Sequence, residues 1–223
     1  MQKSYFSVDS AMIDLDGTLV DTLGDFEVAL NRMLADLGLP AVERAFIERT
    51  VGKGSEHLIR QVLAAQAGAE AVAKLYERAW ASYQLHYLDI NGSCAEVFPG
   101  VREGLDALRA RGLPLACLTN KPLAFARDLL RAKGLDGYFA QVFGGDSFER
   151  KKPDPMPLLK TCEALVSAAA RTLMVGDSEN DARAARAAGC PVALVTYGYN
   201  HGQPVRAVDA DAWLDRLDEL RLQ

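Results

Sequence analysis

Two aspartates separated by one residue follow a short apolar run near the start of the chain. Asp14 and Asp16 come directly after residues 11–13, and Gly17 follows them. Residues two apart on an extended chain project to the same side, and glycine permits a sharp turn after the pair. A pair of carboxylates is also common on solvated surfaces, but its position at the end of an apolar run favours a catalytic role.

Another acidic pair follows an apolar run late in the chain. Asp177 comes after residues 173–175, and Asp181 stands four residues further on. Acidic residues favour the first turn of a helix, and Asp177 or Ser178 could serve as the helix cap. Asp181 would nevertheless lie one turn later and could face the first pair, and four carboxylates gathered in this way would repel one another without a cation. Hard oxygen ligands of this kind suit Mg²⁺.

Two polar segments between these acidic pairs can bind an anion. Thr119 and Asn120 follow an apolar run, and a hydroxyl with free backbone N–H groups at the start of a helix can hold a phosphate. Lys152 lies in a loop whose prolines, Pro153 and Pro155, can hold its ammonium toward the acidic cluster. A solvated basic turn would have the same composition, so this loop is evidence only in combination with the other motifs.

Short apolar runs that end in polar residues are predicted to be buried strands. They cover residues 11–13, 115–118, 173–175 and 192–195. Helical patterns lie between the later runs, and this alternation predicts an α/β fold with a doubly wound, Rossmann-like parallel sheet. Ligands of such sheets bind beyond the carboxyl ends of the strands, where Asp14, Thr119 and Asp177 all fall.

Residues 22–97 break this alternation, because they are predicted to form consecutive helices with no convincing strand. We therefore expect an inserted helical unit at 22–97 and a catalytic α/β core formed by residues 1–21 and 98–223. Junctions after Asp21 and at Phe98-Pro99-Gly100 could act as hinges, although proline and glycine are equally expected in ordinary turns.

The composition favours a cytoplasmic enzyme that acts on a small molecule. The 223 residues are 49% apolar and carry a net charge of −5 with no basic run, which argues against nucleic acid or an anionic membrane as partner. No apolar run approaches the roughly 20 residues of a membrane span, and the start lacks the layout of a signal peptide. The four cysteines are far apart, which favours buried reduced thiols. A monomer or a homodimer is expected.

In their order and context, these motifs resemble the haloacid dehalogenase superfamily of phosphatases, and the inserted helices resemble its α-helical cap. The resemblance narrows to the phosphoglycolate phosphatase family through segments in both parts of the chain. These are residues 49–54, 98–101, 118–122, 144–147, 150–155, 175–181 and 188–200. Ile13 departs from the usual phenylalanine, and residues 91–96 fit the family poorly. The resemblance implies a magnesium-dependent hydrolase of carbohydrate metabolism that converts 2-phosphoglycolate and water to glycolate and phosphate.

The resemblance also implies roles for the acidic residues. Asp14 would attack phosphorus to form an aspartyl-phosphate, and Asp16 would protonate the departing alkoxide and then activate the hydrolytic water. Mg²⁺ would be held by Asp14, by the backbone carbonyl of Asp16 and by Asp177. Asp181 would support the metal.

Substrate contacts are expected at further positions. The resemblance implies that Thr119 and Lys152 bind the transferring phosphoryl oxygens, with backbone N–H groups near Leu15 and Asn120 assisting. In the insert, Lys53 lies between two glycines ahead of a predicted helix, where a cation and free N–H groups could receive a substrate carboxylate. A plain glycine turn capped by Ser55 is the equal alternative.

Several related reactions stay open at this stage. A phosphatase for another small metabolite, such as a sugar phosphate, and a phosphosugar mutase would carry the same motifs. Asp16 argues against a dehalogenase, and the presence of every motif argues against a phosphate-binding module without activity.

Overall fold

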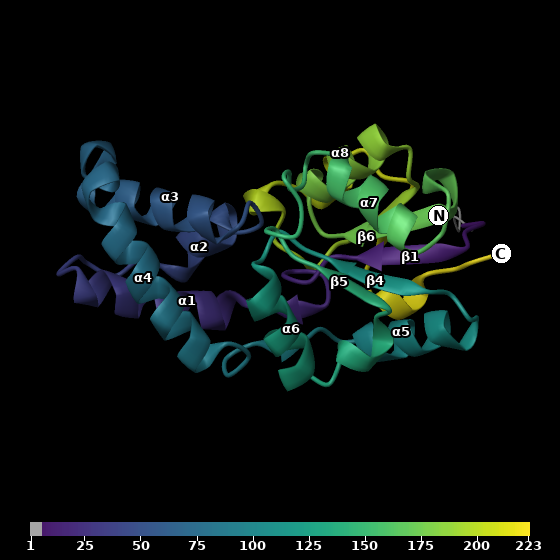
Figure 1. The fold of residues 1–223 in the computed structure, drawn as a ribbon, viewed down its shortest axis with the longest axis horizontal. Helices are drawn as coiled ribbons and strands as arrows, with labels where there is room; N and C mark the ends of the chain where they lie inside the picture. The colour runs from purple at the N-terminus through teal and green to yellow at the C-terminus, as the bar shows by residue number, and fades with distance from the viewer. Residues whose placement is uncertain (1–5) are drawn as a thin grey trace.

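A six-stranded parallel sheet forms the centre of the computed structural model, which describes residues 6–223 (Figure 1). Its strands lie in the order β5-β4-β1-β6-β7-β8. They are β1 (Ser10–Ile13), β4 (Leu115–Leu118), β5 (Gln141–Phe143), β6 (Thr172–Gly176), β7 (Val192–Val195) and β8 (Ala212–Leu214). The predicted doubly wound fold and its four central strands are therefore confirmed, and two edge strands are added to them.

Helices cover both faces of this sheet. On one face lie α5 (Val101–Ala110) and α6 (Leu123–Ala132), and on the other lie α7 (Met156–Ala164) and α8 (Glu179–Ala188) (Figure 1). Successive residues of β1 serve the two faces in turn, because Ala11 and Ile13 pack with α5 and α6 whereas Met12 packs with α7 and α8. Burial on both faces explains why the central strands are continuous apolar runs.

The register of the sheet aligns the ends of its three central strands. Ile13 of β1 is paired with Cys117 of β4 on one side and with Val175 of β6 on the other. Because all three strands are parallel, the residues that follow them emerge at one edge. The chain segments that begin at Asp14, Thr119 and Asp177 are thus brought together by backbone pairing.

Residues 22–97, called the helical insert below, lie beside this edge and extend away from the sheet (Figure 1). Their helices are α1 (Leu23–Asp36), α2 (Arg44–Thr50), α3 (Ser55–Ala67) and α4 (Val72–Ile90). They surround an apolar cluster of their own that includes Leu30, Ile47 and Tyr83, and Phe125 and Tyr199 join it from the core.

A two-stranded antiparallel sheet connects the helical insert to the core. Val20 of β2 (Val20–Asp21) pairs with Val97 of β3 (Glu96–Val97). The expectation of no strand within residues 22–97 is therefore wrong for this short segment, whose two residues are too few to produce a recognisable alternation.

Two further expectations concern the chain as a whole. Cys117, Cys162 and Cys190 are buried, whereas Cys94 is exposed, so the expectation of buried thiols is wrong for Cys94. Among residues 6–223, no helix has the length and apolar character needed to cross a membrane.

Candidate active site

The predicted nucleophile, Asp14, lies just beyond β1 and is only 8% exposed. Its Oδ1 atom is 2.9 Å from the Nζ atom of Lys152. That ammonium is itself held in place, because it donates to the carbonyl oxygen of Leu118 at 2.8 Å and to Oδ1 of Asp181 at 2.7 Å. Burial alone would lower the pKa of Lys152, but the two carboxylates outweigh it and raise that pKa. Lys152 is therefore a fixed positive charge beside Asp14.

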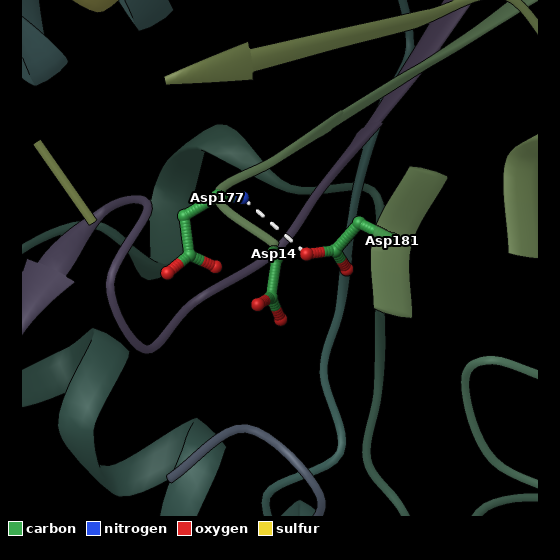
Figure 2. Close-up of side chains that lie close together, drawn as sticks. All are labelled: Asp14, Asp177 and Asp181. Carbon is green, nitrogen blue, oxygen red and sulfur yellow. Dashed lines mark hydrogen bonds between the residues drawn. The ribbon is translucent and has the colours of Figure 1, made fainter. Parts of the chain in front are cut away.

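Three carboxylates converge at this end of the sheet, as Figure 2 shows. Lys152 forms ion pairs with two of them, Asp14 and Asp181. Asp14, Asp177 and Asp181 each place one oxygen within 4.8 Å of the others, and all three are buried. The pKa of Asp14 is raised to about 7, mainly by burial; the charge of Lys152 lowers this pKa and the charge of Asp181 raises it. Burial, followed by the charges of Asp181 and Asp14, raises the pKa of Asp177 well above its usual range. The ionised cluster therefore requires more positive charge than Lys152 supplies.

The donor set of this cluster fits a divalent cation. Oδ1 of Asp14 is buried and has no hydrogen-bond partner, since its contact with Lys152 is an ion pair without hydrogen-bond geometry. Carboxylate oxygens in a partly open arrangement suit Mg²⁺. The side chain of Asp16 lies outside the cluster, which leaves its backbone carbonyl as the only ligand that this residue could offer, as the resemblance implies.

Neighbouring backbone fixes the two carboxylates that follow β6. Asp177 accepts a hydrogen bond from the backbone N–H of Tyr199 at 2.7 Å. Asp181 accepts from the Ser178 hydroxyl at 2.8 Å and, as part of a capping box at the start of α8, from the Ser178 backbone N–H at 3.2 Å. Asp181 therefore supports the start of the helix and belongs to the site cluster at the same time. A Cβ atom on Gly17, whose φ is 83°, would collide with Oδ2 of Asp177. Glycine is thus required here by close approach to a site carboxylate as well as by its φ.

A lysine without a predicted role holds the side chain of Asp16. Nζ of Lys121 lies 2.8 Å from Oδ1 of Asp16, and the lysine side chain is only 1% exposed. The ammonium also lies over the rings of Phe26 at 4.5 Å and Tyr87 at 4.8 Å, both in the helical insert. The sequence motifs assign no role to Lys121. Its position between Asn120 and Pro122, at the end of a strand, is the one sequence feature that points to the site.

The two predicted phosphate-binding residues of this strand end have distinct contacts. The Thr119 hydroxyl accepts the backbone N–H of Lys121 at 3.1 Å. The side chain of Asn120 donates to the carbonyl oxygen of Lys152 at 2.8 Å and to that of Gly52 in the insert at 3.0 Å. Asn120 therefore connects the helical insert to the lysine loop.

A small cavity joins these groups. Residues on its core side are Asp14, Asp16, Thr119, Asn120 and Lys121, and those on its insert side are Phe26, Val51, Gly52, Gly54, Ser55 and Leu58. Its volume is about 20 Å³, little more than the roughly 10–15 Å³ that one water needs on the same measure. The helical insert is thus closed over the core.

Lys53 is not brought into this cavity. The residue is exposed and lines a neighbouring hollow of about 780 Å³ together with Glu179 and Arg183 of α8. Of the predicted site residues, the structure therefore gathers Asp14, Asp16, Thr119, Asn120, Lys152, Asp177 and Asp181, and leaves Lys53 at the outer side of the junction.

Taken together, the fold and the site define a hydrolase of the α/β class. A buried aspartate at the end of a central strand, flanked by a fixed lysine and a metal-compatible carboxylate cluster, can accept and release a phosphoryl group. The family model described as haloacid dehalogenase-like hydrolase matches residues 11–195. The chain belongs to this family, which confirms the predicted resemblance.

Individual relatives are similar over nearly the whole chain. A phosphoglycolate phosphatase of Thiobacillus denitrificans is 44% identical over 100% of this chain and 98% of its own. A plasmid-encoded phosphoglycolate phosphatase of Cupriavidus necator is 47% identical over 95% of this chain and 90% of its own. The crystal structure of a predicted phosphoglycolate phosphatase from Haemophilus somnus superposes with a TM-score of 0.89 at 30% identity, covering 95% of this chain and 96% of that one.

Proposed function

We propose that the protein is a magnesium-dependent phosphatase that hydrolyses 2-phosphoglycolate to glycolate and phosphate. The observation that carries the chemistry is the buried Asp14 between Lys152 and the carboxylates of Asp177 and Asp181. The choice of ester is supported by the names of relatives that are 44% and 47% identical over nearly the whole chain.

The reaction proceeds in two displacements. In the first, a carboxylate oxygen of Asp14 attacks phosphorus, the bond from phosphorus to the ester oxygen breaks, and Asp16 gives its proton to the departing glycolate. In the second, Asp16 takes a proton from a water whose oxygen attacks phosphorus, and the bond from phosphorus to the Asp14 oxygen breaks. Phosphate then departs, and Asp14 is restored as a carboxylate. One residue thus serves as acid and then as base, at the edge of the same cavity as the nucleophile.

Positive charge makes attack by a carboxylate on a phosphate anion possible. Lys152 is fixed 2.9 Å from Asp14 and would contact the transferring phosphoryl oxygens together with the Thr119 hydroxyl. Mg²⁺ would be held by Asp14, Asp177, Asp181 and the backbone carbonyl of Asp16, and would supply charge that offsets the repulsion between nucleophile and phosphate.

The helical insert would act as a cap that opens to admit substrate and closes for the reaction. The cavity volume of about 20 Å³ supports this, because it has no room for a phosphate ester unless residues 22–97 move relative to the core segments 1–21 and 98–223. Of the proposed core segment 1–21, residues 1–5 lie outside the described part of the chain. Lys53 is exposed in the neighbouring hollow, so the closed arrangement gives no support to its predicted contact with the substrate carboxylate. We also propose a cytoplasmic enzyme that works as a monomer or a homodimer.

A panel of phosphate esters tests this assignment. The purified protein at saturating Mg²⁺ is assayed on 2-phosphoglycolate, on sugar monophosphates and on an aryl phosphate, with EDTA-treated protein as the control. The highest kcat/KM is expected for 2-phosphoglycolate, and the activity should disappear with EDTA and return with Mg²⁺. A sugar phosphate with a higher kcat/KM would replace the proposed ester, and full activity without metal would remove Mg²⁺ from the proposal.

A further inference from the structure

A second buried lysine faces the catalytic cavity from the core. The side chain of Lys121 is 1% exposed, yet its ammonium has a single hydrogen-bond acceptor among residues 6–223, Oδ1 of Asp16 at 2.8 Å. An ammonium carries three N–H donors. Because Lys121 lines the cavity, its other donors are available to a ligand there.

Aromatic rings of the helical insert fix this ammonium without using its donors. Phe26 of α1 and Tyr87 of α4 lie 4.5 Å and 4.8 Å from Nζ, and the two rings stack on each other with centroids 5.6 Å apart. The face of an aromatic ring attracts a cation electrostatically. Lys121 is thus held as a positive charge in the cavity when the insert is closed.

The position of Lys121 relative to Asp16 matches the shape of a short phosphorylated acid. In the proposed reaction, Asp16 protonates the ester oxygen of the substrate. The carboxylate of 2-phosphoglycolate lies two atoms beyond that oxygen, and the ammonium of Lys121 lies 2.8 Å from the carboxylate of Asp16. A substrate that places its ester oxygen at Asp16 therefore brings its carboxylate to Lys121.

We infer that Lys121 is the residue that recognises the substrate carboxylate, and that the preferred substrates are short phosphorylated carboxylic acids. The inference rests on the proposed function and attributes the selectivity of the proposed phosphatase to Lys121. Lys53, the cation expected from the sequence, is exposed in the neighbouring hollow instead. The specificity determinant therefore comes from the core strand end after β4, and the insert contributes the rings that hold it.

Two matched substrates measure this recognition directly. 2-Phosphoglycolate is compared with its neutral amide, 2-phosphoglycolamide, which keeps the phosphate ester and the size but carries no carboxylate charge. A charge-assisted hydrogen bond predicts that kcat/KM of the wild type favours the acid by about ten- to a hundredfold. In Lys121→Met, which keeps the apolar stem, this ratio is expected to fall to near one while the amide is still hydrolysed.

Two other lysines provide comparisons. Lys53→Met tests the competing assignment and is expected to retain the wild-type ratio. Lys74→Met removes an exposed cation of α4 in the helical insert and is the matched control. Loss of the ratio in Lys53→Met but not in Lys121→Met would transfer the role to Lys53. An equal loss for both substrates in Lys121→Met would show that Lys121 acts only through Asp16 and would overturn the inference.

The wild type alone separates this inference from the proposed function. If it hydrolyses neither compound, the proposed function fails. If it hydrolyses both equally well, the phosphatase activity stands and carboxylate recognition is refuted. Should Lys121→Met not fold, inhibition of the wild type by glycolate and by glycolamide gives the second measurement. Glycolate is expected to bind at least about tenfold more tightly, and equal binding would overturn the inference.

Discussion

The α/β core and the helical insert contribute to the site in different ways. The core supplies the charged groups, and parallel strand pairing fixes where Asp14 and the β6 carboxylates lie. The insert supplies apolar side chains and backbone, such as Phe26 and Gly52, to the opposite wall of the cavity. In the proposed reaction, the core therefore carries the chemistry of every ester, whereas contact between the two units decides which ester reacts well.

The interactions within the core site also differ from those that join the core to the helical insert. Within the core, the site charges are joined by buried ion pairs at 2.7–2.9 Å. Between the two units, single hydrogen bonds connect the Asn120 side chain to Gly52, Asn91 to the carbonyl oxygen of Phe125, and the backbone N–H of Thr22 to the Tyr199 hydroxyl. The core site is therefore expected to be rigid, and the junction is expected to be the part that opens.

Removing the proposed nucleophile, Asp14, should have the largest effect. Asp14→Asn keeps the shape of the side chain but cannot attack phosphorus, so hydrolysis of all esters should fall by about 10⁴-fold or more with the fold intact. Steady-state kinetics and circular dichroism on the purified variant measure the two quantities. Retention of a tenth of the wild-type activity would exclude Asp14 as the nucleophile.

Removing the fixed cation of the core comes next. Lys152→Met leaves two buried carboxylates without their partner, which should lower the free energy of unfolding by about 3–5 kcal/mol. It should also reduce kcat by about 10²–10³-fold for acid and neutral substrates alike. Lys160→Met is the control, because its partner Glu163 is exposed and the loss should stay below about 1 kcal/mol. Urea unfolding measures the change in stability, and steady-state kinetics measure the change in kcat. A loss of kcat for only one of the two substrates would contradict the assignment of the chemistry of every ester to the core.

The carboxylate cluster should make stability depend on pH and metal together. The pKa of Asp14 is raised to about 7 in the folded protein, so the protonated form is favoured by folding. Without metal, the stability that protonated Asp14 contributes to the folded state is fully present below about pH 4 and is lost as the pH rises through about 7. Mg²⁺ favours the ionised form, so at pH 8 and a hundredfold excess over its dissociation constant it should raise Tm by about 5–10 °C.

Asp177→Asn sharpens this prediction. The variant removes one of the repelling buried charges, so its metal-free form should be at least as stable as the metal-free wild type at pH 8. The Mg²⁺-dependent increase in Tm should be lost at the same time. Thermal unfolding followed by fluorescence at pH 5 and pH 8 provides the measurement, and an undiminished response to Mg²⁺ would show that Asp177 is not a ligand.

The smallest effect is expected at the junction. The Tyr199 hydroxyl donates to Asp21 and accepts the backbone N–H of Thr22, each at 2.8 Å, where the helical insert begins. Tyr199→Phe should cost about 1–2 kcal/mol of stability and change kcat/KM only a few-fold. Tyr197→Phe, which removes a bond to the carbonyl oxygen of Thr18 within the core, is the matched control. A larger kinetic effect for Tyr197→Phe would contradict a special role of the junction.

The sequence predicted those parts of the fold that burial alone determines. Strands β1, β4, β6 and β7 are buried on both faces and therefore appear as apolar runs. The edge strands β5 and β8 were not recognised, because they are short and only partly buried. Residues directly beyond the central strands could be predicted as neighbours for the same reason, since parallel pairing alone brings them to one edge.

The rest of the site depends on packing that no local pattern encodes. Lys121 gains its position from rings that belong to α1 and α4 of the helical insert. Lys53 has the sequence context of an anion site, but the way the insert lies on the core leaves it exposed beside α8. Contacts between segments that are far apart in the sequence therefore decide that Lys121 lies in the cavity and that Lys53 lies outside it.

The covalent intermediate is the most direct test of the chemistry assigned to the core. Wild-type protein is mixed with 2-phosphoglycolate and Mg²⁺, quenched in acid during turnover, and digested for mass spectrometry. The account predicts an added phosphoryl group on Asp14 and none in Asp14→Asn, because acid quenching preserves the acyl phosphate. A phosphoryl group on another residue, or continued turnover by Asp14→Asn with a modified peptide elsewhere, would contradict it.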